Sequence, residues 1–221
     1  MKKLSIIILA IICLMPLFVN AQTKKVKETF NEDDKVHFDW EEYVDKKGGV
    51  EIKEGCLLLT NKEKNSSRMV FVNLPIDVEK NFKITAAIIV PNLNDKEYFG
   101  ITIDNTEKDF TKQAFFIQEG WLKFAVIQND VEGNEYDEIE ASNQRYITLY
   151  REFKRIKLKG GKNQTVNAVI EKKGKKLIFS INNMQVYEIY HKAADFLTAP
   201  CLGFIVNGNN SLKIDEIVIE Q

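Results

Sequence analysis

The sequence predicts an all-β fold, a sandwich of two antiparallel sheets in one domain, and three observations favour it. Short β-rich segments recur along almost the whole chain, with turn residues between them. Several of these segments alternate apolar and polar residues, which is the pattern of a strand with one covered face and one wet face. Helical patterning is scarce and is limited to one or two turns within residues 190–197.

The first residues predict export. Lys2 and Lys3 give a positive start, residues 4–19 are almost wholly apolar, and Ala21 supplies a small residue before a cut. This arrangement is typical of a secretory signal peptide, so we expect residues 1–21 to be removed and the protein to be secreted or periplasmic. The apolar run is shorter than the ~20 residues of a spanning helix, and no second run follows. No membrane span is therefore expected after cleavage.

We expect the mature chain to form one folding unit. Residues 22–29 form a polar leader and residues 30–221 a single domain, without an internal repeat or a flexible linker. Glycine-containing connections at 118–120 and 172–175 predict two β-hairpins. The expected strands are, in order, residues 50–52, 56–59, 68–74, 82–90, 98–103, 114–117, 121–127, 166–171, 177–181, 185–189, 202–206 and 212–219.

The charge balance excludes one class of partner. The chain has 31 basic and 32 acidic residues, with a formal net charge of −1 at pH 7. Nucleic-acid-binding domains are normally strongly basic, so we expect no nucleic-acid partner.

Two cysteines, Cys56 and Cys201, remain after signal cleavage. An oxidising compartment permits a disulfide between them, and the long loop that it would close favours one entropically. The alternative is a pair of buried thiols that behave as small apolar residues.

An ordered series of motifs resembles a known superfamily. The motifs are Gly55-x-Leu57-x-Leu59, Phe82-x-Ile84-x-Ala86, the 116–124 hairpin, Asn163 before an alternating strand, Gly174-x-x-Leu177-x-Phe179-x-Ile181-Asn182, and Leu202-Gly203-Phe204 ending in Ile214-Asp215-x-Ile217-x-Ile219. Together they resemble the concanavalin A-like lectin/glucanase superfamily, and within it laminin-G-like domains and the 3-keto-disaccharide hydrolase-like domains of exported bacterial proteins. The resemblance covers nearly all of residues 28–221 and implies a two-sheet antiparallel jelly roll.

Ligand binding is predicted on the wet side of one sheet. Trp121 and Lys123 alternate with apolar residues that we expect to face the core, so the two point the other way. Tyr98 has the same phase in its own strand. Aromatic rings on a wet face suit stacking on the apolar face of a sugar. The alternative is that loops cover both rings as a second, minor core. Trp40, near the start of the domain, is interpreted as a packing residue.

An acidic segment is the candidate for catalysis. Glu135, Asp137 and Glu140 match, with a one-residue bulge, the acidic run of laminarinase-like members of the superfamily. In such a run one carboxylate attacks the sugar and another protonates the leaving oxygen, so that a glycosidic bond is hydrolysed with retention. The neighbouring residues 128–134 are those of a solvated acidic loop, and a run of charge is usually a wet face.

The resemblance also implies a structural calcium. Glu28 and Asp215 match positions that hold this ion in members of the superfamily, and calcium prefers such oxygen ligands. The alternative is that Asp215 hydrogen-bonds nearby backbone. No other cofactor is expected.

Three functions follow from these observations. The first hypothesis is an exported, non-catalytic module that binds carbohydrate or a cell-surface polymer. The alternatives are a glycoside-cleaving enzyme that uses residues 135–140, and a structural or protein-interaction domain like many laminin-G modules. One architecture hosts all three, so the fold alone does not choose between them.

Overall fold

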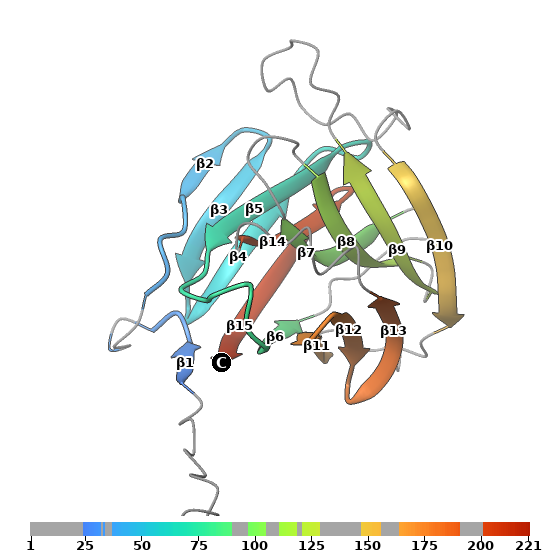
Figure 1. Cartoon of the computed structure of the whole chain (residues 1–221). Helices are drawn as coiled ribbons and strands as arrows, with labels where there is room; N and C mark the ends of the chain where they lie inside the picture. The colour runs from blue at the N-terminus through green and yellow to red at the C-terminus, as the bar shows by residue number, and fades with distance from the viewer. Residues whose placement is uncertain are drawn as a thin grey trace, which may run out of the picture.

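The computed structural model describes residues 24–31, 33, 37–89, 97–104, 111–118, 121–128, 147–155, 164–190 and 201–221. For the strands over 121–128 and 147–155, and for parts of some others, the description covers the backbone and its pairing. Within these ranges the secondary structure is entirely β (Figure 1). None of the described residues forms a helix long and apolar enough to cross a membrane.

The larger sheet has nine strands. Its order is β13-β12-β11-β6-β15-β4-β3-β2, and β1 pairs with β15 beside this path. These strands are β1 (Lys25–Glu28), β2 (Tyr43–Asp45), β3 (Gly48–Lys53), β4 (Cys56–Asn61), β6 (Phe82–Ile89), β11 (Thr165–Lys173), β12 (Lys176–Ile181), β13 (Met184–Tyr190) and β15 (Asn210–Glu220).

The smaller sheet has six strands in the order β10-β9-β8-β7-β14-β5. They are β5 (Ser67–Asn73), β7 (Tyr98–Asp104), β8 (Thr111–Gln118), β9 (Trp121–Gln128), β10 (Ile147–Arg155) and β14 (Cys201–Asn207). Every pairing in both sheets is antiparallel. The predicted all-β, two-sheet antiparallel jelly-roll sandwich is confirmed.

The expected hairpins are present. Gln118 pairs with Trp121 across the β8–β9 connection, and Lys173 pairs with Lys176 across the β11–β12 turn. The structure adds strands that the alternation did not indicate, among them β1 and β2. β1 lies inside the stretch described above as a polar leader. Its pairing continues outward through two backbone hydrogen bonds between Lys24 and Gln221.

One buried cluster joins the two sheets. Leu57 of β4, Phe179 of β12 and Phe204 of β14 are each at most 1% exposed and belong to it. The rings of Phe115 and Phe179 stack across the sandwich, with centroids 4.1 Å apart and planes 11° from parallel. Inward-facing residues of both sheets therefore form a single core, as alternation requires.

Trp40 packs in this core, as predicted. Its side chain is 6% exposed. The indole lies between two phenylalanine rings, with centroids 6.2 Å from Phe30 and 6.0 Å from Phe204. It thereby holds the segment before β2 against the sandwich.

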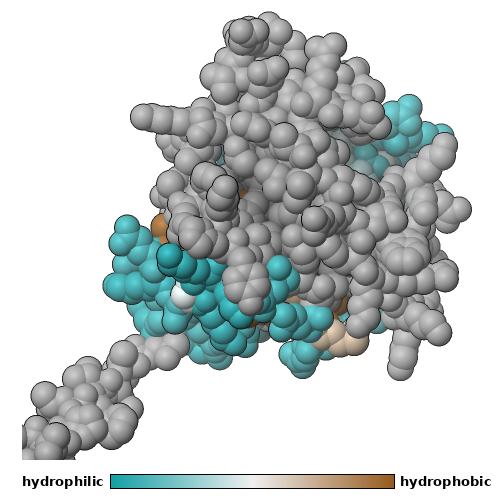
Figure 2. Space-filling model, turned by 45° about the vertical axis from the view of Figure 1, so that its right-hand side comes forward, coloured by the Kyte–Doolittle hydropathy of each residue, from teal (hydrophilic) through white to brown (hydrophobic). Residues whose placement is uncertain are grey.

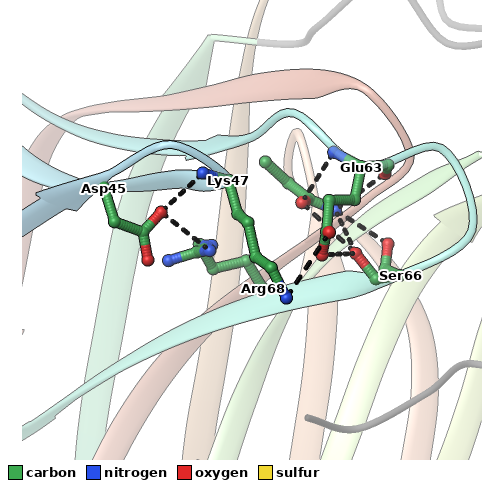
Figure 3. Close-up of polar contacts among 6 residues, drawn as sticks. Asp45, Lys47, Glu63, Ser66 and Arg68 are labelled. Carbon is green, nitrogen blue, oxygen red and sulfur yellow. Dashed lines mark hydrogen bonds and ion pairs between the residues drawn. The ribbon is translucent and has the colours of Figure 1, made fainter.

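A polar cluster closes one end of the sandwich (Figure 3). Asp45 accepts a hydrogen bond from the Lys47 amide at 2.7 Å and pairs with Arg68 at 3.5 Å. The Lys47 ammonium lies 3.7 Å from Glu63, whose carboxylate also accepts a hydrogen bond from the Ser66 hydroxyl at 3.3 Å. The contacts tie the β2–β3 turn of the large sheet to the β4–β5 connection and to β5 of the small sheet.

Candidate functional site

The candidate site is the outer face of the six-stranded sheet, meaning the face turned away from the core. In β7, Phe99, Ile101 and Ile103 are each 1% exposed and belong to the core. Because successive strand residues point to opposite faces, Tyr98 and Thr102 lie on the outer face. In β14 the same reasoning places Cys201, Gly203, Ile205 and Asn207 there, since Leu202, Phe204 and Val206 belong to the core.

Tyr98 is held in place by hydrogen bonds. Its hydroxyl lies 2.7 Å from the Ser67 hydroxyl, which also accepts a hydrogen bond from the Asn207 amide at 3.0 Å. The same Asn207 nitrogen donates to the Ser66 carbonyl at 2.9 Å. Burial raises the pKa of Tyr98, and the hydrogen bond with Ser67 partly opposes this effect. The phenol is thus a fixed, neutral group at the end of three strands.

The sheet register relates Tyr98 to Trp121 and Lys123. Tyr98 pairs with Gln118 of β8, and Gln118 pairs with Trp121 of β9. The two aromatic residues therefore occupy one cross-strand row, two strand spacings or about 10 Å apart. Lys123 pairs with Phe116 and lies in the neighbouring row. For Trp121 and Lys123 the structure describes the backbone alone.

The described side chains on the outer faces of the two sheets differ in charge. The nine-stranded sheet carries ion pairs across its strands: Lys27–Glu216, Lys25–Glu220 at 3.6 Å, Lys83–Glu220 at 3.7 Å and Lys176–Glu188 at 3.0 Å. In Figure 2 the coloured surface in the lower part of the molecule is mainly hydrophilic. The outer face of the nine-stranded sheet thus carries balanced charge beside the buried aliphatic side chains of Val169 and Ile178.

On the six-stranded sheet the outer face is uncharged wherever its side chains are described. Its described side chains are those of Ser67, Met69, Phe71, Asn73, Tyr98, Thr102, Cys201, Ile205 and Asn207. Ile205 is 4% exposed yet stands apart from the central core. The described part of this face therefore combines apolar side chains with neutral hydrogen-bonding groups, which is the composition of many small-molecule sites.

The acidic segment proposed for catalysis lies outside the described residues. Glu135, Asp137 and Glu140 all fall in the range 129–146. The structure therefore neither pairs these carboxylates nor separates them.

The proposed calcium ligands are not brought together. Glu28 is fully buried and pairs with Ile217 of the core. Its carboxylate accepts hydrogen bonds from the Phe38 amide at 2.6 Å and the Trp40 indole at 3.4 Å. Asp215 is exposed on the other face of the same sheet, beside an irregularity in the β15–β6 pairing. This pair does not fit a calcium site, and the described residues contain no cluster of three potential metal ligands.

The disulfide considered for Cys56 and Cys201 is not formed. Cys56 begins β4 in the large sheet, where its thiol lies 3.8 Å from an Asp215 oxygen on the outer face. Cys201 begins β14 in the small sheet and also lies on an outer face. Packed sheets are about 10 Å apart, whereas a disulfide needs Cα atoms within about 7 Å. The sandwich itself separates the two cysteines.

The alternation missed the polar partners of Tyr98. Ser67 and Asn207 belong to strands that are distant in sequence, and they meet Tyr98 through the β5–β14–β7 order. The outward phase of Ser67 was readable from the buried Val70 and Val72 that follow it. The strands that lie beside β5 could not be predicted in this way, because strand order is a tertiary property.

Solved structures share this architecture. A glycoside hydrolase family 16 endo-glucanase from Bacteroides ovatus superposes with a TM-score of 0.59 at 13% identity, covering 88% of this chain and 99% of that one. A legume lectin-like domain from Entamoeba histolytica gives a TM-score of 0.54 at 16% identity, covering 78% and 87%. The CBM2 module of the evolved Dit of Lactobacillus casei BL23 phage J-1 gives 0.53 at 13% identity, covering 90% and 96%.

These likenesses show the fold. The chain has the concanavalin A-like lectin/glucanase fold over most of its length, as its motifs indicate. No protein-family model matches the sequence, and no curated protein sequence matches it.

Proposed function

We propose that this chain is an exported, non-catalytic module that binds carbohydrate or a cell-surface polymer on the outer face of the six-stranded sheet. The contacts would come from Tyr98, Trp121 and Lys123. The observation that carries the proposal is the cross-strand row of Tyr98, Gln118 and Trp121, in which the phenol of Tyr98 is already fixed by Ser67. Fixed aromatic groups limit the side-chain entropy that is lost on binding.

The contrast between the two outer faces supports this choice of surface. The outer face of the large sheet carries ion pairs across its strands, and its apolar side chains Val169 and Ile178 are aliphatic and 8% exposed, so they offer a saccharide little surface on which to stack. The outer face of the small sheet offers apolar side chains beside neutral hydroxyl and amide groups. Sugars present both C–H faces and hydroxyl groups, so the second surface is the better match.

The similar structures are consistent with a saccharide ligand. They are a legume lectin-like domain, a CBM2 module and an endo-glucanase in complex with G4G3G-2F-DNP. The identities are too low to transfer any of these activities. The proposal therefore depends on the surface of this chain.

Affinity electrophoresis tests the proposal. The mature protein would be run through gels that contain barley mixed-linkage β-glucan, laminarin, xylan or polygalacturonate. We expect at least one neutral polymer to retard the wild type, and Trp121→Ala to weaken that binding about tenfold, because one aromatic contact is lost. Trp121→Phe should retain part of the binding. Met184→Ala, an exposed apolar residue of the large sheet, is the matched control and should bind like wild type.

Two results would contradict the proposal. Absence of retardation by every polymer would exclude carbohydrate binding of this kind. Equal retardation of wild type and Trp121→Ala would remove the aromatic row from the site. Release of reducing sugar from any polymer would instead support the glycoside-cleaving alternative.

A further inference from the structure

Thr102 of β7 carries a hydroxyl group that is buried in the fold. Its side chain is 0% exposed, and its Oγ1 has no hydrogen-bond partner among the residues that the structure describes. Such a hydroxyl has lost its water without gaining a partner, which costs stability. Valine has nearly the same shape and would fill the position without that penalty. Packing therefore accounts for the shape of Thr102 and leaves its hydroxyl unexplained.

The hydroxyl lies on the outer face of the six-stranded sheet. Thr102 of β7 pairs with Gly203 of β14, and Gly203 pairs with Phe71 of β5, so the three form one cross-strand row. Thr102 lies four residue steps along β7 from Tyr98, so the two rows are about 13 Å apart. Both rows thus lie on the surface proposed for ligand binding.

Gly203 leaves space where the other two side chains meet. A Cβ atom on Gly203 would lie 2.3 Å from the Thr102 hydroxyl oxygen and 2.5 Å from a carbon of the Phe71 ring. Any larger residue would displace one or both. Phe71 is half-buried in β5, the edge strand of the sheet, and its ring lies against the glycine beside the hydroxyl. The ring is therefore one of the groups that lie beside the oxygen.

We infer that Thr102, Gly203 and Phe71 form a closed subsite that opens when the Phe71 ring moves and then hydrogen-bonds a neutral hydroxyl or carbonyl group of the ligand. This inference rests on the proposed function and names the ligand class for the same surface. The described neighbours of the hydroxyl, Gly203 and Phe71, offer no counter-ion, so a charged group would be desolvated beside them without compensation. The subsite therefore selects uncharged saccharide units and disfavours uronic acids and sulfated sugars.

Thr102→Val tests the inference because it removes the hydroxyl and keeps the shape. We expect its affinity for a neutral glucan, probed with barley β-glucan by isothermal titration calorimetry, to fall about five- to tenfold, the value of one hydrogen bond. Its melting temperature without glucan should rise by about 2–4 °C, because an unpartnered buried group is gone. Thr102→Ser retains the hydroxyl and should retain most of the affinity. Gly203→Ala should block binding, because its methyl group would fill the space between the Thr102 hydroxyl and the Phe71 ring.

The affinity and the melting temperature of Thr102→Val together distinguish a hydroxyl that contacts the ligand from one that is hydrogen-bonded within the fold. A Thr102→Val protein that is less stable than wild type would mean that the hydroxyl has a partner in the fold, and would overturn the inference. Unchanged affinity would overturn it as well. If Trp121→Ala weakens binding while Thr102→Val does not, the proposed function stands and the subsite fails. If wild type binds none of the four polymers, both fail together.

Discussion

At the scale of single residues, Cys56 shows how the fold sets the reactivity of a partly buried thiol at the start of a strand. Its thiol lies 3.8 Å from the Asp215 carboxylate. Burial raises the pKa of Cys56, the negative charge of Asp215 raises it further, and Lys213 acts in the opposite direction. A raised pKa means less thiolate at neutral pH and hence slower alkylation, since the thiolate is the nucleophile.

We therefore predict that Asp215→Asn speeds the alkylation of Cys56. In a Cys201→Ala background at pH 8, the rate with iodoacetamide should increase about two- to fivefold, the effect of one charge at this distance in a wet site. Lys213→Ala should slow the same reaction. The advantage of Asp215→Asn should shrink as the pH rises and the thiol ionises in both proteins. Equal rates for all three proteins at pH 8 would contradict this electrostatic account.

Some of these residue positions were predictable from sequence. Tyr98 lies opposite the buried Phe99 and Ile101, as the phase of its strand indicated. The position of Asp215 was harder, because β15 departs from strict alternation between Ile214 and Ile217, both fully buried. That spacing of three was a readable sign of a bulge. What the carboxylate then contacts depends on β4, a strand from the other end of the chain.

At the scale of elements, two glycines with left-handed backbone make a matched pair. Gly48, in the β2–β3 hairpin, has φ 137°, and the three atoms nearest to a Cβ there would all be backbone, the nearest being the Thr60 carbonyl oxygen at 2.1 Å. Gly174, in the β11–β12 turn, has φ 55° and open space around the same position. Gly48 is favoured as glycine both by its positive φ and by the close backbone contact, whereas Gly174 is favoured by its positive φ alone.

We predict that Gly48→Ala destabilises the protein much more than Gly174→Ala. The first should lower the free energy of unfolding by at least about 3 kcal/mol, because strain and a backbone clash combine, and the second by about 1 kcal/mol, the cost of a left-handed residue. Urea denaturation of the two variants beside wild type measures both. Equal losses would show that the close approach of β3 to β4 is not as tight as described.

The hairpins were the most predictable elements, and the short edge strands the least. A turn signal between two alternating runs is local, so the β8–β9 and β11–β12 hairpins follow from sequence. β2 has three residues, all exposed, and shows no alternation. β1 is a strand because β15 leaves an edge at Ile217–Glu220, beyond the residues that pair with β4. No local pattern encodes such an edge.

At the scale of the whole molecule, the division into two sheets decides which surface is available for binding. Alternation identified the inward residues of both sheets, and the Phe115–Phe179 stack confirms that they meet in one core. It did not indicate which strands share a sheet. For that reason the sequence left open a Cys56–Cys201 disulfide, whose two cysteines the sandwich separates. Glu28 and Asp215 share a sheet but lie on its opposite faces, because β15 departs from alternation between Ile214 and Ile217.

Mapping a bound saccharide on the protein tests the central claim most directly. Backbone amide chemical shifts of the mature protein would be followed by NMR during titration with a short barley β-glucan oligosaccharide. We predict that the largest shifts fall in β5, β7, β8, β9 and β14, around Tyr98, Thr102 and Trp121. Strands β6, β11 and β15 of the nine-stranded sheet should change little. Shifts centred on those three strands, with the six-stranded sheet unaffected, would contradict the account.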